Sequence, residues 1–423
     1  MYAYRYEHRP VLTQARVGRW LDLTQGQISR LERSADAMRD LHKLDRWARA
    51  LRIPERHLWF RLTEQPSRAY SEIALGPSLL NDGRKGDDVR RRELFKAAGL
   101  AASNFGWFSA PTPASVTKHA IGLVDITGIR EMTRTFRRLD NRFGGGHARS
   151  TVSGYLASEV VPLLRTARAT DAVRVELHSA VAELNQLAGW MAYDVGDADV
   201  GTKHLRQALR LCQAVDDDAL SAEMLAGMSH QAAFFRSGAT AVDLAQAART
   251  SAARSGLAAL VSESAVMAAH GHALQGHTQP CLDALGESER ALSAAGHQET
   301  PEWLRYFDSA YLAAKFAHCF RDLGRPIESE RYARRSLEMT EGYDRGRLFN
   351  LSVLASALAD QGRVEEACTT AAIAVAMAGT VRSVRTIAYL ADVGRRLNRH
   401  RSVAPVATLF RQMTAAEIPL PTR

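Results

Sequence analysis

The chain has 423 residues, of which 46% are apolar and 24% are charged, and its formal net charge is +9. This length is sufficient for two or three domains with a substantial core, and the composition excludes a disordered or fibrous protein. No apolar run approaches the roughly 18 residues that span a bilayer, so the sequence predicts a protein without a membrane partner.

The positive charge is concentrated at the start of the chain. Residues 1–63 contain 13 Lys and Arg against 7 Asp and Glu, a net charge of +6. The remaining residues are therefore nearly neutral. This asymmetry favours a small N-terminal domain that contacts nucleic-acid phosphates.

Residues 23–32 are predicted to form a short helix with side chains suited to reading DNA bases. Thr24 can cap its first turn. Gln and Arg form bidentate hydrogen bonds with adenine and guanine edges in the major groove. Helical spacing places three such side chains opposite the apolar Ile28 and Leu31, namely Gln25, Gln27 and Arg30.

A helix is also predicted before this segment, over residues 13–21 with Thr13 as its N-cap. A tight turn at residues 22 and 23 joins the two helices. Helix, short turn and helix form the helix-turn-helix unit, whose second helix enters the major groove. Apolar spacing predicts two further helices, over residues 41–51 and 55–60.

The runs LTQARVGRWLDLTQGQISRLE and LHKLDRWARALRIPERHLWF resemble the Xre-type, lambda-repressor-like helix-turn-helix family. The resemblance implies a domain over residues 1–62 that binds double-stranded DNA. The chain departs from the family in one helix, because the helix expected before the first Thr-Gln pair is cut short at Pro10. The resemblance also implies contacts from the first helix to phosphate and from the second helix to bases. The predicted DNA-binding residues are Gln14, Thr24, Gln25, Gln27, Ser29 and Arg30.

Residues 63–115 are predicted to be a linker with a basic helix, because turn residues are frequent from 66 to 86. The run RRRELFKAAGLAA over residues 90–102 resembles a twin-arginine export signal. Export signals belong at an N-terminus, whereas this run follows a predicted DNA-binding domain. We therefore expect an amphipathic linker helix and a cytoplasmic protein.

Residues 116–423 contain a repeated pattern of small residues. Five glycines are predicted to end helical segments: Gly196, Gly238, Gly276, Gly324 and Gly362. Small residues recur seven before, five after and twelve after each glycine, with Gln231 and Asp243 as the less regular members. Small residues at fixed offsets allow two helices to cross closely, and the pattern resembles tetratricopeptide repeats. We therefore expect an all-α protein that ends in an α-solenoid of helical hairpins.

The first helix of each hairpin in such a solenoid lines an extended concave face, which is usually a binding surface. The inward positions are expected ten, six and three residues before each glycine. Aromatic, His, Gln and Arg side chains there suit a peptide or a small molecule, although core packing is the alternative for each. The candidate ligand-binding residues are Gln186, Trp190, Tyr193, Phe235, His270, His318 and Arg321, with Met228 at one further position.

No pattern typical of an enzyme or a metal site is present. The chain lacks HExxH, GxSxG and a phosphate-binding loop, and its four cysteines form no CxxC pair. The glycine-rich run at residues 142–147 has no Lys-Ser or Lys-Thr after it, so we expect a flexible loop. The aromatic residues of segment 300–320 are expected in the core, with a pocket wall as the alternative. We predict no enzymatic activity, no metal ion and no cofactor.

An Xre-type domain followed by tetratricopeptide-like repeats resembles the signal-responsive regulators of Gram-positive bacteria, and the Ala- and Arg-rich composition resembles the actinobacterial ones. The resemblance implies a homodimeric transcriptional regulator whose repeats bind a signal. A protein-interaction scaffold with a vestigial DNA-binding domain is the alternative.

Overall fold

The structure is a computed structural model that describes residues 120–421, apart from 167 and 297, together with Thr13, Gln25 and Ser29. The chain divides into two units, Met1–Asn81 and Asp82–Arg423. In the first unit, Gln25 and Ser29 have α-helical backbone, and Gln25 is exposed while Ser29 is half-buried. Four predicted DNA-binding residues and the linker run lie outside the described residues: Gln14, Thr24, Gln27, Arg30 and residues 90–102.

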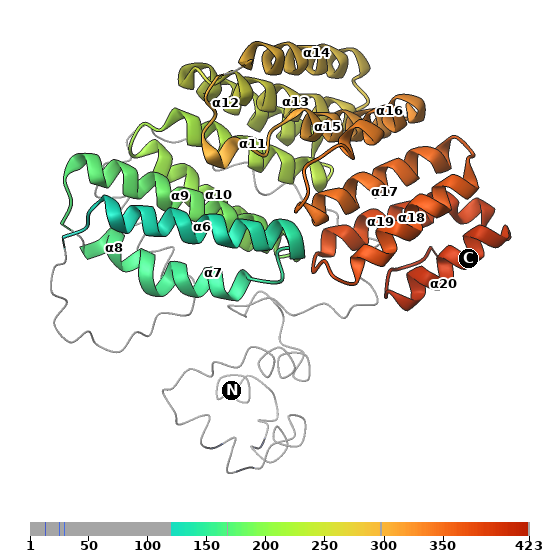
Figure 1. Cartoon of the computed structure of the whole chain (residues 1–423), viewed down its shortest axis with the longest axis horizontal. Helices are drawn as coiled ribbons and strands as arrows, with labels where there is room; N and C mark the ends of the chain where they lie inside the picture. Colours follow the sequence, from blue (N-terminus) through green and yellow to red (C-terminus); the bar gives the residue numbers. More distant parts are fainter. Residues whose placement is uncertain are drawn as a thin grey trace. The chain divides into compact units, whose positions relative to one another are not determined.

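The described part of the second unit is all-helical, which confirms the predicted fold class for this region (Figure 1). Its helices are α6 (Leu123–Phe143), α7 (Arg149–Tyr155), a π-helical turn (Leu156–Val160), α8 (Val161–Thr166), α9 (Asp171–Asp194), α10 (Ala198–Gln213), α11 (Asp218–Phe234), α12 (Gly238–Ser255), α13 (Ala258–Leu274), α14 (Thr278–Ala295), α15 (Ser309–Asp322), α16 (Pro326–Ser336), α17 (Asp344–Asp360), α18 (Val364–Ala378), α19 (Val384–Leu397) and α20 (Ala404–Ala415). Short 3-10 turns lie at Glu302–Leu304 and Asn398–His400. Within the described ranges, none of these helices is both long and apolar enough to cross a bilayer.

Successive helices from α9 to α18 pack as five hairpins, as the repeat pattern predicts. The first helix of each hairpin also packs on the first helix of the next, from α9 through α11, α13 and α15 to α17. These first helices form the inner layer of the unit, and the second helices form the outer layer. Helix α19 continues the inner layer by packing on α17, and α20 continues the outer layer by packing on α18. Figure 1 shows this succession from green to red.

The turn inside each hairpin requires one residue with positive φ. Glycine supplies it in four hairpins, at Gly196, Gly276, Gly324 and Gly362. In the second hairpin, Arg236 takes this position with a φ of 60°, and Gly238 is already the first residue of α12. The expected alignment of that repeat was therefore wrong by two residues. Gly238 serves packing instead, because a Cβ there would lie 2.8 Å from the carbonyl oxygen of Gly271.

Counting from Arg236 makes the small-residue rows regular. Ser229, Ala241 and Ala248 replace the expected members in the second hairpin, and all three are fully buried. The rows lie where the two helices of a hairpin cross. A Cβ on Gly201 would approach the carbonyl oxygen of Gly189 to 3.0 Å, and Ser229 Oγ donates to the carbonyl of Ala241 over 2.7 Å. Close backbone approach thus explains the pattern.

The glycine-rich run at residues 142–147 is a packed joint, so the prediction of a flexible loop was wrong. The Gly145 amide donates to Asp194 Oδ2 over 2.9 Å. The Gly146 amide donates to the carbonyl of Arg382 over 3.1 Å, and the Arg382 amide donates to that of Phe143 over 2.7 Å. The start of the helical unit is thereby fastened to the turn before α19.

Buried ion pairs reinforce this joint. Arg345 on α17 donates to both carboxylate oxygens of Asp140 on α6, each over 2.8 Å. Arg345 also lies 3.3 Å from the carboxylate of Asp194, whose other oxygen accepts from Ser383 Oγ over 2.9 Å. The last inner helices therefore contact the first ones. The inner face differs from the extended open groove that was expected, because its two ends meet.

We expect Gly145→Ala to lower the free energy of unfolding by roughly 1–3 kcal/mol, the usual cost of overpacking. A Cβ at Gly145 would lie 2.7 Å from the carbonyl oxygen of Met191 and 2.8 Å from its Cα, and both are backbone atoms. Gly128 is the matched control, because it lies within α6 with nothing near the added Cβ. Gly128→Ala should raise stability by up to about 1 kcal/mol, since alanine favours a helix over glycine. Urea unfolding of both variants measures the difference, and equal effects would contradict a packed joint.

Candidate functional site

A pocket of about 140 Å³ opens on the inner face, between α11, α13 and α15 on one side and α19 on the other. Its wall is largely charged or polar, unlike the mostly apolar wall of a typical small-molecule site. The polar and aromatic side chains that line it are His230, Phe234, Arg236, His270, Lys315, His318, Arg321, Asp322, Tyr389, Asp392, Arg395 and Arg396.

Asp322, at the end of α15, is the centre of the first polar group in this wall. His270 Nε2 lies 3.1 Å from its Oδ2, and Arg321 donates to it from Nε over 3.3 Å. Arg236 lies 3.6 Å away as an ion pair. Although burial alone would raise the pKa of this carboxyl, the charge of Arg321 and the hydrogen bond of His270 hold it well below its ordinary value. Asp322 is therefore ionised and fully engaged by its neighbours.

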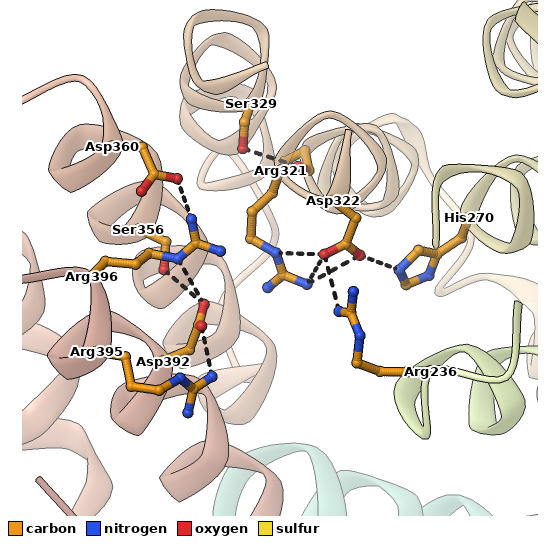
Figure 2. Close-up of polar contacts among 11 residues, drawn as sticks. Arg236, His270, Arg321, Asp322, Ser329, Ser356, Asp360, Asp392, Arg395 and Arg396 are labelled. Atoms are coloured by element: carbon orange, nitrogen blue, oxygen red, sulfur yellow. Dashed lines mark hydrogen bonds and ion pairs between the residues drawn. The ribbon is translucent and has the colours of Figure 1, made fainter. Parts of the chain in front are cut away.

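Asp392 on α19 is the centre of a second polar group, opposite the first (Figure 2). It accepts from Arg396 Nε over 3.0 Å and from an Arg395 guanidinium nitrogen over 2.8 Å. Burial opposes ionisation here too, but Arg396 and its neighbours lower the pKa of Asp392. Arg396 also pairs with Asp360. Figure 2 shows the Arg321 guanidinium between the Asp322 carboxylate and the Asp392–Arg396 pair.

Lys315 on α15 is buried, with only 4% of its surface exposed. Its Nζ makes a close contact with His230 Nδ1, and the other ring nitrogen of His230 lies 3.2 Å from an Arg385 guanidinium nitrogen. Arginine can only donate, so His230 Nε2 must accept and Nδ1 must carry the proton. That proton then points at the lone pair of a neutral lysine. Burial, with the charge of Arg385, lowers the pKa of Lys315 to about 7, in agreement with this pattern.

Several buried polar atoms of the interior lack a hydrogen-bond partner among the residues that the structure describes. They are Tyr193 Oη, Glu263 Oε2, Arg385 Nε, and the Nδ1 atoms of His270 and His318. Each such atom costs about 1–3 kcal/mol when it stays unsatisfied. Burial lowers the pKa of both His270 and His318, so these rings are neutral at pH 7. Of the five residues, only His270 and His318 line the pocket, so their Nδ1 atoms are the ones that a polar ligand there could satisfy.

Only some of the predicted ligand-binding residues line this pocket. His270, His318 and Arg321 do. Gln186 instead donates to Glu223 over 2.5 Å in the core, and Trp190 packs edge-on against His230 at 5.2 Å between ring centroids. The other three predicted positions, Tyr193, Phe235 and Met228, do not contribute to the pocket wall.

His230 could have been found from the sequence. In the corrected repeat it lies six residues before Arg236, the same offset at which His270 and His318 precede their glycines. The misplaced turn glycine concealed it and gave Phe235 as the inner residue, where the neighbouring Phe234 lines the pocket. Lys315 also had a signal, because it is the single lysine in the largely apolar run AYLAAKFAHCF.

The aromatic segment before α15 packs in the core and adds a buried acid pair. Tyr306 Oη lies 2.7 Å from Glu263 and 2.9 Å from Glu223, and its single proton can satisfy only one of them. Burial, together with the neighbouring Glu223, raises the pKa of Glu263 well above its ordinary value. The two glutamates therefore share a proton.

The prediction that the aromatic residues of segment 300–320 pack in the core is confirmed for Phe307, which is buried.

No protein-family model matches the chain, and the comparison with curated proteins found no match. The chemistry of the pocket is therefore the basis for a functional assignment. Its two distinguishing properties are a buried lysine beside a cationic wall and two buried histidine nitrogens, Nδ1 of His270 and of His318, that have no partner among the described residues.

We expect Lys315→Met to be more stable than the wild type at pH 7 and to lose that advantage as the pH rises. The lysine has its ordinary pKa of 10.5 when unfolded and about 7 when folded. Between these values the unfolded chain binds more protons, so the wild type gains stability with pH at up to roughly 1.4 kcal/mol per pH unit. Urea unfolding at intervals from about pH 7 to about pH 9.5 measures this. Lys203→Met, at an exposed position of α10, is the control, and a pH-independent gap between Lys315→Met and the wild type would contradict the assignment.

Proposed function

We propose that this chain is a sequence-specific DNA-binding regulator whose helical-repeat unit binds a small molecule in the inner pocket. The observation that carries the ligand-binding part is the charged pocket wall, in which the Nδ1 atoms of His270 and His318 have no hydrogen-bond partner among the described residues. Stable folds rarely leave such atoms unpaired, whereas binding sites do so at a cost that a ligand recovers.

The size of the pocket favours a small molecule over a signalling peptide. A peptide is usually held along an extended groove, where successive side chains find separate pockets. Here the two ends of the inner layer meet, and the pocket measures about 140 Å³. A cavity of about 150 Å³ is enough for a molecule of benzene size.

The position of the pocket supports a route from ligand to conformation. Its walls come from α11, α13 and α15 and from α19. Helix α19 also carries Arg385, which lies 3.6 Å from Asp194 at the joint between the first and last inner helices. A ligand that bridges the two walls stabilises the closed joint, and this population shift alters the spacing of the two DNA-binding domains in a homodimer.

The DNA-binding part is supported by the sequence of the first unit and by its charge. Residues 1–63 have a net charge of +6, and charge of this sign attracts the phosphate backbone. Gln25 is exposed on a helix, the placement that a base-reading side chain needs.

Replacing Gln25, Gln27 and Arg30 together with Ala should abolish the preference for specific DNA. Each lost bidentate contact is worth about 1–3 kcal/mol of discrimination between bases. Fluorescence anisotropy should compare duplexes from the protein's own locus with scrambled duplexes over a series of salt concentrations. The control is Gln246→Ala with Arg249→Ala, which removes a glutamine and an arginine from exposed positions of α12.

If the protein is a regulator, the control variant keeps the wild-type preference for DNA from its own locus and the triple variant loses it. The alternative, a protein-interaction scaffold, predicts no preference in the wild type. A wild-type protein with no salt-sensitive preference for its own locus would contradict the proposed function.

A further inference from the structure

The pocket contains more positive than negative charge. Four arginines line it, and three carboxylates neutralise them: Asp322 and Asp392 in the wall, and Asp360, which pairs with Arg396. Lys315 adds a further basic group to the wall. Among the residues that the structure describes, no carboxylate forms an ion pair with Lys315, whose close contact is with His230. The wall therefore has an excess of basic groups and an amine without a counter-ion.

The basic groups are arranged from the rim inward. The side chains of Arg236 and Arg395 are 67% and 61% exposed, so they lie at the mouth. Arg321 and Lys315 lie deeper, and the Arg321 side chain is only 13% exposed. Figure 2 shows Arg236 and Arg321 directed at the same carboxylate, that of Asp322. A guanidinium has five N–H donors, so each keeps donors for a second acceptor.

We propose that the pocket binds a small anion, a carboxylate or a phosphate, held by Arg236, Arg321 and Lys315. This inference rests on the proposed function, because it names the ligand class of the same site. Lys315 is neutral beside His230 because a buried cation without a counter-ion is unfavourable, and an anion in the pocket supplies the charge that favours the protonated amine. Arginine forks match both carboxylate and phosphate oxygens, so the shared chemistry is the anionic oxygen.

The volume limits the size of this anion. About 140 Å³ accommodates an anion of roughly six to ten non-hydrogen atoms, by comparison with cavities that hold benzene. Inorganic phosphate and succinate fall in or below this range. Succinamide has the shape of succinate without its charge, and so it separates charge from fit.

Isothermal titration calorimetry of the full chain at constant ionic strength tests the proposal with phosphate, succinate and succinamide as probes. We expect one-to-one binding of phosphate, of succinate or of both, and binding of succinamide at least about tenfold weaker, as for the loss of a charge-assisted hydrogen bond. Preference for succinate assigns a carboxylate and preference for phosphate assigns a phosphoryl group.

Two variants should weaken anion binding by about tenfold each, in line with the loss of one charged contact. Lys315→Met removes the buried amine and is expected to fold at least as well as the wild type, so lost binding cannot be attributed to misfolding. Arg236→Gln removes the guanidinium at the rim. Lys203→Met and Arg249→Gln, at exposed positions outside the pocket, are the matched controls and should bind as the wild type does.

The proposal is overturned if neither anion binds, if succinamide binds as well as succinate, or if Lys315→Met and Arg236→Gln bind like the controls. DNA anisotropy on the same preparations keeps the two hypotheses apart. Specific DNA binding without anion binding contradicts only the ligand class. Anion binding without specific DNA binding contradicts only the regulator.

Discussion

The helical unit depends on the carboxylate of Asp194, which is completely buried at the end of α9. It accepts hydrogen bonds from Ser383 and from the Gly145 amide, and it faces Arg345 and Arg385. These partners come from the loop after α6, from α17 and from α19, so one side chain connects the first and last parts of the unit. A buried charge is tolerated only when its environment satisfies it, and here the whole closure supplies that environment. Opening the joint would leave the carboxylate without its partners.

Such an arrangement contributes more to specificity than to net stability. Desolvating Asp140, Asp194 and Arg345 costs about as much as their attraction returns, so apolar residues of similar volume could give equal stability. Charged groups, however, are satisfied in one arrangement only, whereas apolar surfaces can pack against each other in several registers. A chain of stacked hairpins has soft curvature, because each hairpin contacts only its neighbours. The buried ion pairs fix one curvature and thereby fix the distance across the pocket between α15 and α19.

For the described part of the second unit, the sequence was sufficient to predict the all-α class, the five hairpins and the close crossings within them. These features depend on helical periodicity and on small residues at short, fixed offsets. It was insufficient for the closure, since Asp194 and Ser383 are 189 residues apart and neither has a local pattern. The prediction for the glycines at 144–146 was wrong for the same reason, because their partner Arg382 is also far away in the sequence. The predicted alignment of the second repeat was wrong by two residues because glycine serves two purposes, a positive φ and close packing. The sequence alone does not distinguish them. The DNA-binding residues of the first unit stay predictions.

The second hairpin has Arg236 where the other hairpins have a turn glycine, and this difference affects how the pocket can evolve. The left-handed backbone at Arg236 costs a residue with a Cβ about 1–2 kcal/mol relative to glycine. Every other hairpin turn avoids this strain, and the strained one is at the pocket mouth with its guanidinium near Asp322. Strain of this kind tends to persist where a side chain has a use other than folding. Substitution of Arg236 by glycine would give a more stable turn and a less cationic pocket mouth. Stability and ligand recognition therefore favour different residues at this position.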